Sequence, residues 1–133
     1  MLLSDAVCTE LLGYSALTDI VSTRIYQVKL PQNTPYPAVT SQLIGGEPIE
    51  HTSEADTGNP LGTRYQVTAF AKDLDTAQDA AVEVKNCLED FTGSLGSGVT
   101  VQRIFLDGHP VELWNEAPEV WQVSQDFLIW WVE

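Results

Sequence analysis

Histidine and cysteine are the side chains of this 133-residue chain best suited to metal binding, nucleophilic attack or proton transfer. The sequence holds two of each, at His51, His109, Cys8 and Cys87. Zinc sites and catalytic triads need several such residues together, and the sequence has no CxxC pair and no closely spaced second histidine. We therefore expect two surface histidines and two reduced cysteines that pack as small core residues. A disulfide between the two helices predicted to carry the cysteines is the alternative.

Short motifs of catalysis are also missing from the sequence. It contains no GxSxG elbow, Walker loop, HExxH or GxGxxG motif. The acidic pair Asp73 and Asp75 lies at a predicted helix start, where capping and the helix dipole explain it. Two carboxylates that meet only in the fold could still form a hydrolase site, although no residue points to one. We therefore expect that the protein is not an enzyme and needs no cofactor or metal.

Charge restricts the partners more than any motif does. Nineteen acidic residues against six basic ones give a net charge of −13, and no base follows Arg103. High-affinity binding to a phosphate backbone needs clustered lysine and arginine, so this composition excludes an ordinary nucleic-acid-binding protein. With 44% hydrophobic residues the chain can form a proper core, and we expect one domain over residues 1–133.

Localisation is predicted from the two ends of the chain. The N-terminal residues lack the basic start and cleavage site of a signal peptide. The apolar run at the C-terminus is far shorter than the roughly 20 residues of a membrane-spanning helix. These features predict a cytoplasmic protein that makes no contact with a membrane.

The elements that position these residues begin with two main helices and a shorter one, predicted from apolar residues at four-residue spacing. Ser4 is the expected cap of the first helix, and Gly13 its stop. Ser15 is expected to cap a short helical turn. Asp75 is expected to begin the longest helix with a capping box, and Gly93 to end it.

Strands are predicted from alternating or continuous apolar segments bounded by glycine and proline. The predicted strands are residues 24–30, 38–44, 63–72, 99–106 and 120–132, with a short additional one at 111–114. Residues 93–98, GSLGSG, are expected to form a flexible turn. The order of these elements predicts an α+β fold, in which a mostly antiparallel sheet of about four to five strands packs against two main helices.

A long mobile loop is predicted at residues 45–62, because this stretch is acidic, has no periodicity and is bracketed by glycines and prolines. Loops of this length without secondary structure are uncommon in compact domains and are often functional. Its candidate partner-contacting residues are Glu47, Glu50, His51, Glu54 and Asp56.

The last predicted strand ends in six consecutive apolar residues, FLIWWV. Its odd positions form a face that helices should cover. Its even positions are polar at first and become apolar at Leu128, Trp130 and Val132. Such an apolar end needs a cover. The cover is either the segment around Trp114 folding back or another subunit, since tryptophan is over-represented at buried interface anchors.

Three short motifs follow one another along the chain: RIY at residues 24–26, PQNTPYP at 31–37, and RYQV at 64–67 leading into the longest helix. In this order and spacing they resemble the small tail-completion proteins of long-tailed phages, also called tail terminators or head-tail joining proteins. The resemblance extends to about Phe91, and the order of elements continues to the end of the chain.

The resemblance implies a structural virion protein that forms a homo-oligomeric ring, with six copies expected. The ring would cap the head-proximal end of the tail tube, between the major tail tube protein and the head-completion or connector protein. Assembly would take place in the host cytoplasm, and DNA would pass through the ring without specific binding, which a negative lumen favours. The candidate subunit-interface residues are Leu128, Trp130, Val132, Trp114, Arg24 and Tyr26.

Two other functions are consistent with the sequence. A head-closure protein on the capsid side, a stopper or adaptor, would share the ring and the acidity but bind the portal. A small cytoplasmic enzyme or ligand-binding domain would instead hold an apolar pocket under the tryptophans.

Overall fold

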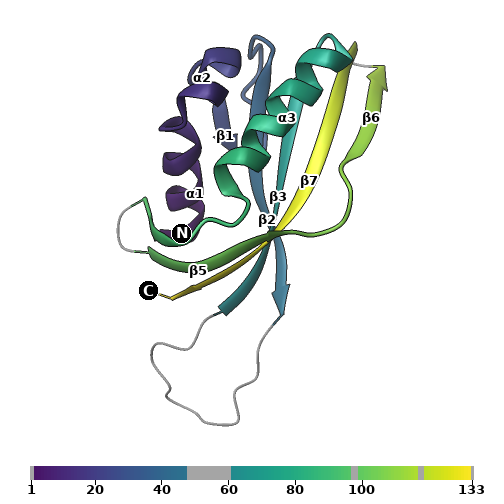
Figure 1. Cartoon of the computed structure of the whole chain (residues 1–133). Coiled ribbons are helices and arrows are strands. Elements are labelled where there is room, and N and C mark those ends of the chain that lie inside the picture. The colour runs from purple at the N-terminus through teal and green to yellow at the C-terminus, as the bar shows by residue number, and fades with distance from the viewer. Residues whose placement is uncertain (1, 48–60, 97–98, 117–118, 133) are drawn as a thin grey trace.

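The computed structural model describes residues 2–47, 61–96, 99–116 and 119–132, in which three helices lie on one face of a seven-stranded sheet (Figure 1). The helices are α1 (Leu2–Leu12), α2 (Ser15–Val21) and α3 (Leu74–Leu88). The strands are β1 (Ile25–Gln27), β2 (Ala38–Glu47), β3 (Leu61–Ala71), β4 (Gly93–Leu95), β5 (Val99–Leu106), β6 (Val111–Glu116) and β7 (Glu119–Val132). The α+β class is confirmed, whereas the predictions of four to five strands and of packing against two helices were wrong.

The sheet is ordered β1-β2-β3-β7-β5-β4, and β6 pairs with β7 outside this path. All of these pairs are antiparallel except β1 with β2, which is parallel. Along one edge of β7, β5 pairs with residues 127–132 and β6 with residues 119–124. The backbone N–H of Asp107, between them, donates to the carbonyl of Asp126 at 2.8 Å. Together β5 and β6 therefore form one interrupted strand along β7.

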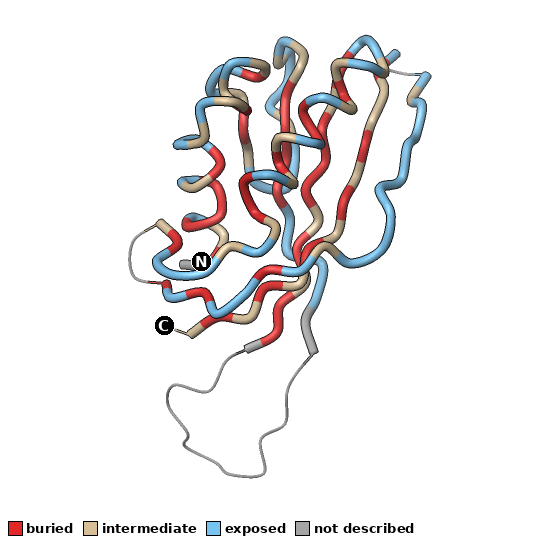
Figure 2. The backbone as a smooth tube through the Cα atoms, viewed as in Figure 1, coloured by how far each residue is buried: buried red, intermediate tan, exposed pale blue. Residues whose placement is uncertain are grey.

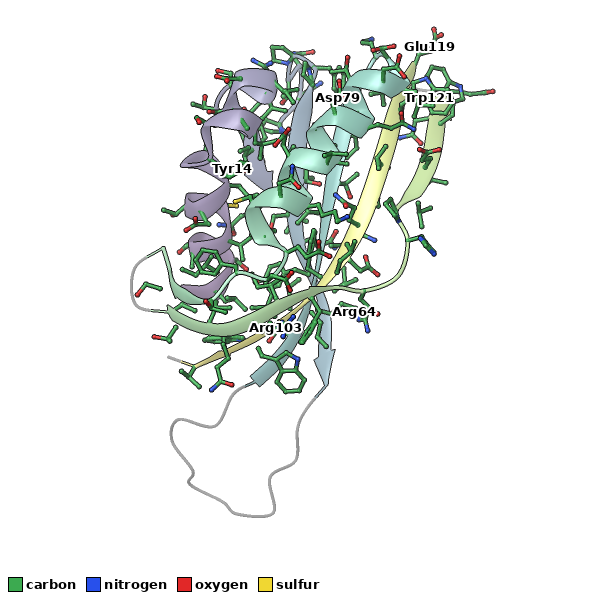
Figure 3. The ribbon with its side chains drawn as sticks, in the orientation of Figure 1. Tyr14, Arg64, Asp79, Arg103, Glu119 and Trp121 are labelled. Carbon is green, nitrogen blue, oxygen red and sulfur yellow. The ribbon has the colours of Figure 1, made fainter. Side chains whose placement is uncertain are left out.

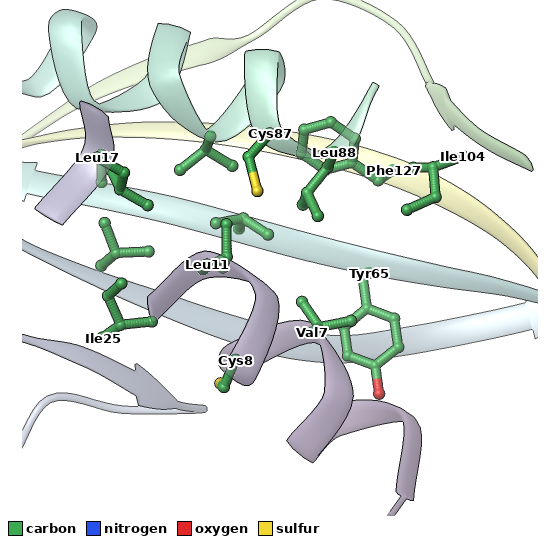
Figure 4. Packing of buried hydrophobic residues seen from close by; sticks show 14 of the residues in the cluster. Val7, Cys8, Leu11, Leu17, Ile25, Tyr65, Cys87, Leu88, Ile104 and Phe127 are labelled. Atoms are coloured by element: carbon green, nitrogen blue, oxygen red, sulfur yellow. The ribbon is translucent and has the colours of Figure 1, made fainter. Parts of the chain in front are cut away.

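The core lies between the helices and the sheet (Figures 2 and 4). Val7 and Leu11 of α1 and Leu88 of α3 are fully buried there, together with Tyr65 of β3 and Phe127 of β7. The buried face of α3 is rich in alanine, which lets the helix lie close to β3 and β7. Burial of these side chains is the main stabilisation of the fold.

The cap of the long helix lies two residues before the expected one. Asp73 has the extended backbone of an N-cap, and its carboxylate accepts the backbone N–H of Thr76 at 3.1 Å. Asp75 therefore lies in the first turn, where its charge complements the helix dipole. The helix ends at Leu88, because the backbone N–H of Asp90 already donates to a carbonyl of β5. Gly93, expected to end the helix, instead begins β4.

The expected serine caps of the two N-terminal helices were also wrong. Ser4 lies inside α1, and its hydroxyl is 2.5 Å from that of Tyr65. The N-cap of α2 is Tyr14, which makes no capping hydrogen bond through its side chain, and Ser15 is the first helical residue. α1 ends at Leu12, so the stop predicted at Gly13 is confirmed.

The predicted loop at residues 45–62 is shorter at both ends. Gly45, Gly46 and Glu47 continue β2 and pair with Arg64, Thr63 and Gly62 of β3. A bulge between Leu43 and Gly45 precedes this extension, and the φ of 141° at Gly45 is accessible to glycine. The centre of the predicted loop lies outside the described residues. None of the three helices has the length and hydropathy to span a membrane.

Candidate assembly interface

The two adjacent tryptophans of β7 point to opposite faces of the sheet. Trp131 belongs to the core, because it is 6% exposed and its Nε1 donates to Thr63 Oγ1 at 2.9 Å. Trp130 lies on the face away from the helices, half-buried. A Cβ on its cross-strand neighbour Gly62 would come within 3.1 Å of the indole ring. The absence of a side chain at Gly62 therefore lets the ring rest directly on β3.

An apolar surface, which we call the sheet-end surface, surrounds this indole. It consists of Leu128, Trp130 and Val132 of β7 and Phe105 of β5. Phe105 stands directly opposite Leu128 and is 41% exposed. The three β7 residues share one face by strand alternation and are each half-buried. The predicted apolar end of the last strand therefore exists and remains partly open to solvent.

Sequence reasoning missed Phe105 because of a bulge in β5. Strict alternation would place Phe105 on the same face as Val99 and Val101, which are buried in the core. The pairing with β7 shifts between Val101 and Arg103, so Ile104 turns inward and Phe105 outward. The two successive polar residues before Ile104 were the available signal.

Two arginines, which are labelled in Figure 3, border the sheet-end surface: Arg64 stands opposite Leu128, and Arg103 opposite Trp130. The Arg103 guanidinium lies 4.8 Å from the centre of the Phe105 ring and forms an ion pair with Asp90 at 3.0 Å. Arg64 forms an ion pair with Asp107 and lies 3.8 Å from a carboxylate oxygen of Asp126. An apolar centre with a charged rim is the usual anatomy of a protein–protein interface.

The segment around Trp114 does not cover the sheet-end surface. It forms β6, which pairs with the opposite half of β7, and Trp114 stands across from Trp121 with ring centroids 5.0 Å apart. One of the two covers considered from sequence is therefore wrong. The other, a second subunit, stays a prediction.

β6 is a second apolar region, at an edge of the sheet. Within the described residues it pairs only with β7, and its side chains at Val111, Leu113 and Trp114 are 54%, 51% and 41% exposed. Val111 and Leu113 were not among the predicted interface residues. Their signal in the sequence was that Glu112 separates these two apolar residues, as expected for alternation in a strand that follows a turn.

The predicted interface residues of the first strand lie at another edge. Arg24 precedes β1, and its Nε donates to the carbonyl of Pro37 at 2.8 Å, so it holds the connection to β2. Tyr26 lies in β1, which is separated from β6 by β2, β3 and β7. The six predicted interface residues thus fall into three places: the β1 edge, the β6 edge and the sheet-end surface.

Of the predicted partner-contacting residues, only Glu47 is described by the structure. It ends β2 and pairs with Gly62. Glu50, His51, Glu54 and Asp56 lie outside the described residues, so their role stays a prediction.

An open groove of about 510 Å³ runs between α3 and the junction of β5 and β6. Val82 and Lys85 of α3 line it together with Leu106, His109 and Glu112, and the Gln78 amide donates to Glu112 at 2.5 Å. His109 is exposed. Across the described ranges, no three residues of the types that ligate metals are grouped so that they could hold an ion.

Both cysteines are buried free thiols, as predicted. Burial raises the pKa of Cys8, and it raises the pKa of Cys87 to about 12. Cys87 Sγ lies 3.8 Å from the carbonyl oxygen of Glu10 in α1. At neutral pH the thiols are therefore protonated and poor nucleophiles, which suits packing rather than chemistry.

The chain is similar to known proteins in sequence and in fold. The sequence model of the family described as "Tail completion protein gp17" matches residues 5–131. A chain in the solved structure "Virion of native gene transfer agent (GTA) particle" has a similar fold, with a TM-score of 0.74 and 16% identity over 97% of this chain and 93% of that one. None of the curated proteins matches the sequence.

Proposed function

Because the chain belongs to the tail completion protein gp17 family, we propose that this structural virion protein forms a ring that terminates the tail tube at its head-proximal end. One side of the ring would contact the major tail tube protein, and the other the head-completion or connector protein. This is a function of surface matching, in which no bond is made or broken.

The observation that carries the proposal is the distribution of the exposed surfaces. A ring requires heterologous contacts, in which one patch of each subunit meets a different patch of the next subunit. The β1 edge and the β6 edge lie on opposite sides of the sheet, as this arrangement requires (Figure 1). A symmetric dimer would need only one self-complementary patch.

The sheet-end surface supplies the apolar anchor of the assembled state. Trp130 and Leu128 would become fully buried against another subunit, and the arginine rim at Arg64 and Arg103 would meet acids of that subunit. Burial of an aromatic anchor inside a polar rim accounts for most of the affinity in many interfaces.

Light scattering over a concentration series, with negative-stain imaging, tests the proposal. We expect rings with an open centre, either alone or after addition of tail tube protein. Trp130→Ala should raise the concentration needed for assembly by at least roughly tenfold, the loss expected for an anchor residue. Leu12→Ala is the matched control, because Leu12 is an exposed apolar residue on α1.

A chain that remains monomeric at every concentration, even with tail tube protein present, would contradict the proposal. Equal effects of Trp130→Ala and Leu12→Ala would remove the sheet-end surface from the interface. Binding assays with tail tube protein and with connector protein separate a tail terminator from a capsid-side stopper. A stopper would bind the connector and leave the tube unbound.

A further inference from the structure

The free edge of β6 has the properties of an edge that can pair with another strand. In an antiparallel pair, alternate residues direct their N–H and C=O groups away from the neighbouring strand. Six-residue β6 has this edge unpaired among the described residues, next to the exposed side chains of Val111 and Leu113. Natural proteins usually block such an edge with lysine, proline or a bulge, because it is a template for further pairing.

Charge distinguishes the possible partner strands. β6 and the start of β7 carry Glu112, Glu116 and Glu119, with no base among the described residues between 111 and 124. The edge strand that pairs with β6 should therefore be basic. Among the described strands, a second copy of this chain offers the edges of β1 and β4, besides another β6 edge that carries the same acids.

The β1 edge is the basic one. Arg24 lies immediately before β1, and Lys29 lies two residues after it and is exposed. Lys72 belongs to the same end of the sheet: it lies 5.5 Å from the ring of Tyr36, next to the Pro37 carbonyl that Arg24 binds. Near the β4 edge, the bases Lys85 and Arg103 are already paired with Glu89 and Asp90, so neither is free to meet the acids of β6.

Strand direction is also compatible. β6 is antiparallel to β7, β7 to β3 and β3 to β2, and β2 is parallel to β1. Within one subunit β1 and β6 therefore run in opposite directions. Rotation about a ring axis keeps the direction of each strand along that axis, so β1 of one subunit would meet β6 of the next in antiparallel orientation.

We infer that the β6 edge of each subunit pairs with the β1 edge of the next, which joins the sheets around the ring. Backbone hydrogen bonds contribute affinity, as in other cases of strand addition. The acids around β6 and the bases around β1 fix the direction of the contact. This inference rests on the proposed ring and specifies how its subunits join.

Site-specific cross-linking tests the contact directly. Leu113→Cys in β6 and Tyr26→Cys in β1 are combined in one chain, and the assembled protein is treated with a short bis-maleimide. We expect a ladder of covalent oligomers up to the closed ring. The single variants should yield no ladder, and the native thiols should not react because both are buried.

A charge exchange provides a second test that needs no new cysteine. Glu116→Lys and Lys29→Glu should each raise the half-assembly concentration by roughly two- to fivefold, and the double variant should restore it. Glu83→Lys and Lys85→Glu on α3 are the matched controls and should change it less. The double variant Glu116→Lys with Lys29→Glu is decisive, because a non-specific effect of each charge change would not be cancelled by the other.

The outcomes separate the inference from the proposed ring. Rings that form without a Leu113–Tyr26 ladder, or without restoration in the edge double variant, would overturn the strand pairing and leave the ring standing. Absence of rings with and without tail tube protein would overturn both.

Discussion

A single glycine sets how closely α1 can approach the sheet. Gly96, just after β4, has a φ of 56°, and a Cβ there would lie 2.8 Å from Ala6 Cα in α1. An alanine at this position would adopt a left-handed backbone and also displace a helix backbone. We expect Gly96→Ala to lower the free energy of unfolding by about 2–4 kcal/mol, measured by urea denaturation.

Gly108→Ala is the control for that change. Gly108 also has a positive φ, of 84°, but nothing lies within 4 Å of its Cβ position. The cost there should be limited to the backbone term, about 1–2 kcal/mol. The difference between the two variants isolates the contact with α1, and equal losses would mean that α1 moves aside without cost.

At the scale of the element, the start of α3 shows what periodicity can and cannot locate. Four residues of the predicted apolar stripe, Ala77, Ala81, Val84 and Leu88, are buried in the helix, because apolar spacing depends only on which face meets the core. The fifth, Phe91, lies beyond the end of the helix. The position of the cap depends on the backbone angles of one residue. Two nearby aspartates have equally suitable side chains, so the sequence does not distinguish them. The structure selects Asp73 and leaves Asp75 in the first turn.

This choice of cap is testable by substitution. Asp73→Ala should destabilise the protein by about 1 kcal/mol, because it leaves the Thr76 N–H without its acceptor. Asp75→Ala should cost only a few tenths of a kcal/mol, the value of a charge near a helix start partly offset by the better helix propensity of alanine. Thermal unfolding of both variants tests this assignment. Asp73→Asn is the control, because asparagine can also cap a helix. A larger loss at Asp75 would contradict the assignment.

The strands were predictable to different degrees for a physical reason. β5 and β7 lie within one residue of their expected bounds, since their apolar runs are long and continuous. β4 was missed because its three residues look like a flexible turn in sequence. The side-chain faces of β5 were not predicted beyond Val101, because a bulge that depends on pairing with β7 reverses them. Its trace in the sequence was the pair of successive polar residues before Ile104.

At the scale of the whole molecule, the sequence indicated which apolar residues lie outside the core, but not where the fold places them relative to one another. Trp114 pairs with Trp121 near the start of β7, whereas Trp130 belongs to β7 itself, near its end. Their separation follows from strand register, which is set by the pairing of distant segments. The proposal of a ring with two different contact surfaces therefore depends on the structure.

The distribution of acid over the molecule gives the last prediction. Asp75, Asp79 and Glu83 follow one another at four-residue spacing on the outer side of α3, and in the described structure the ion pair of Lys85 is with Glu89 instead. Like charges at this spacing destabilise a helix by about 0.2–0.5 kcal/mol per pair. The helix dipole offsets this repulsion at Asp75, so the cost falls on Asp79 and Glu83. We expect the acidic row to serve the assembled state, in which a negative wall would keep DNA moving through the ring.

We therefore expect Asp79→Lys with Glu83→Lys to slow DNA ejection from virions assembled with the variant, and to make its rings retain linear DNA at low salt. The control, Glu10→Lys with Asp19→Lys, changes the net charge equally but lies on α1 and α2. Because strong DNA binding requires bases along the DNA path, only the first pair should act if α3 faces the lumen. Equal behaviour of the two variants would place the acid row on the outside of the ring, where its repulsion could not act on the passing DNA.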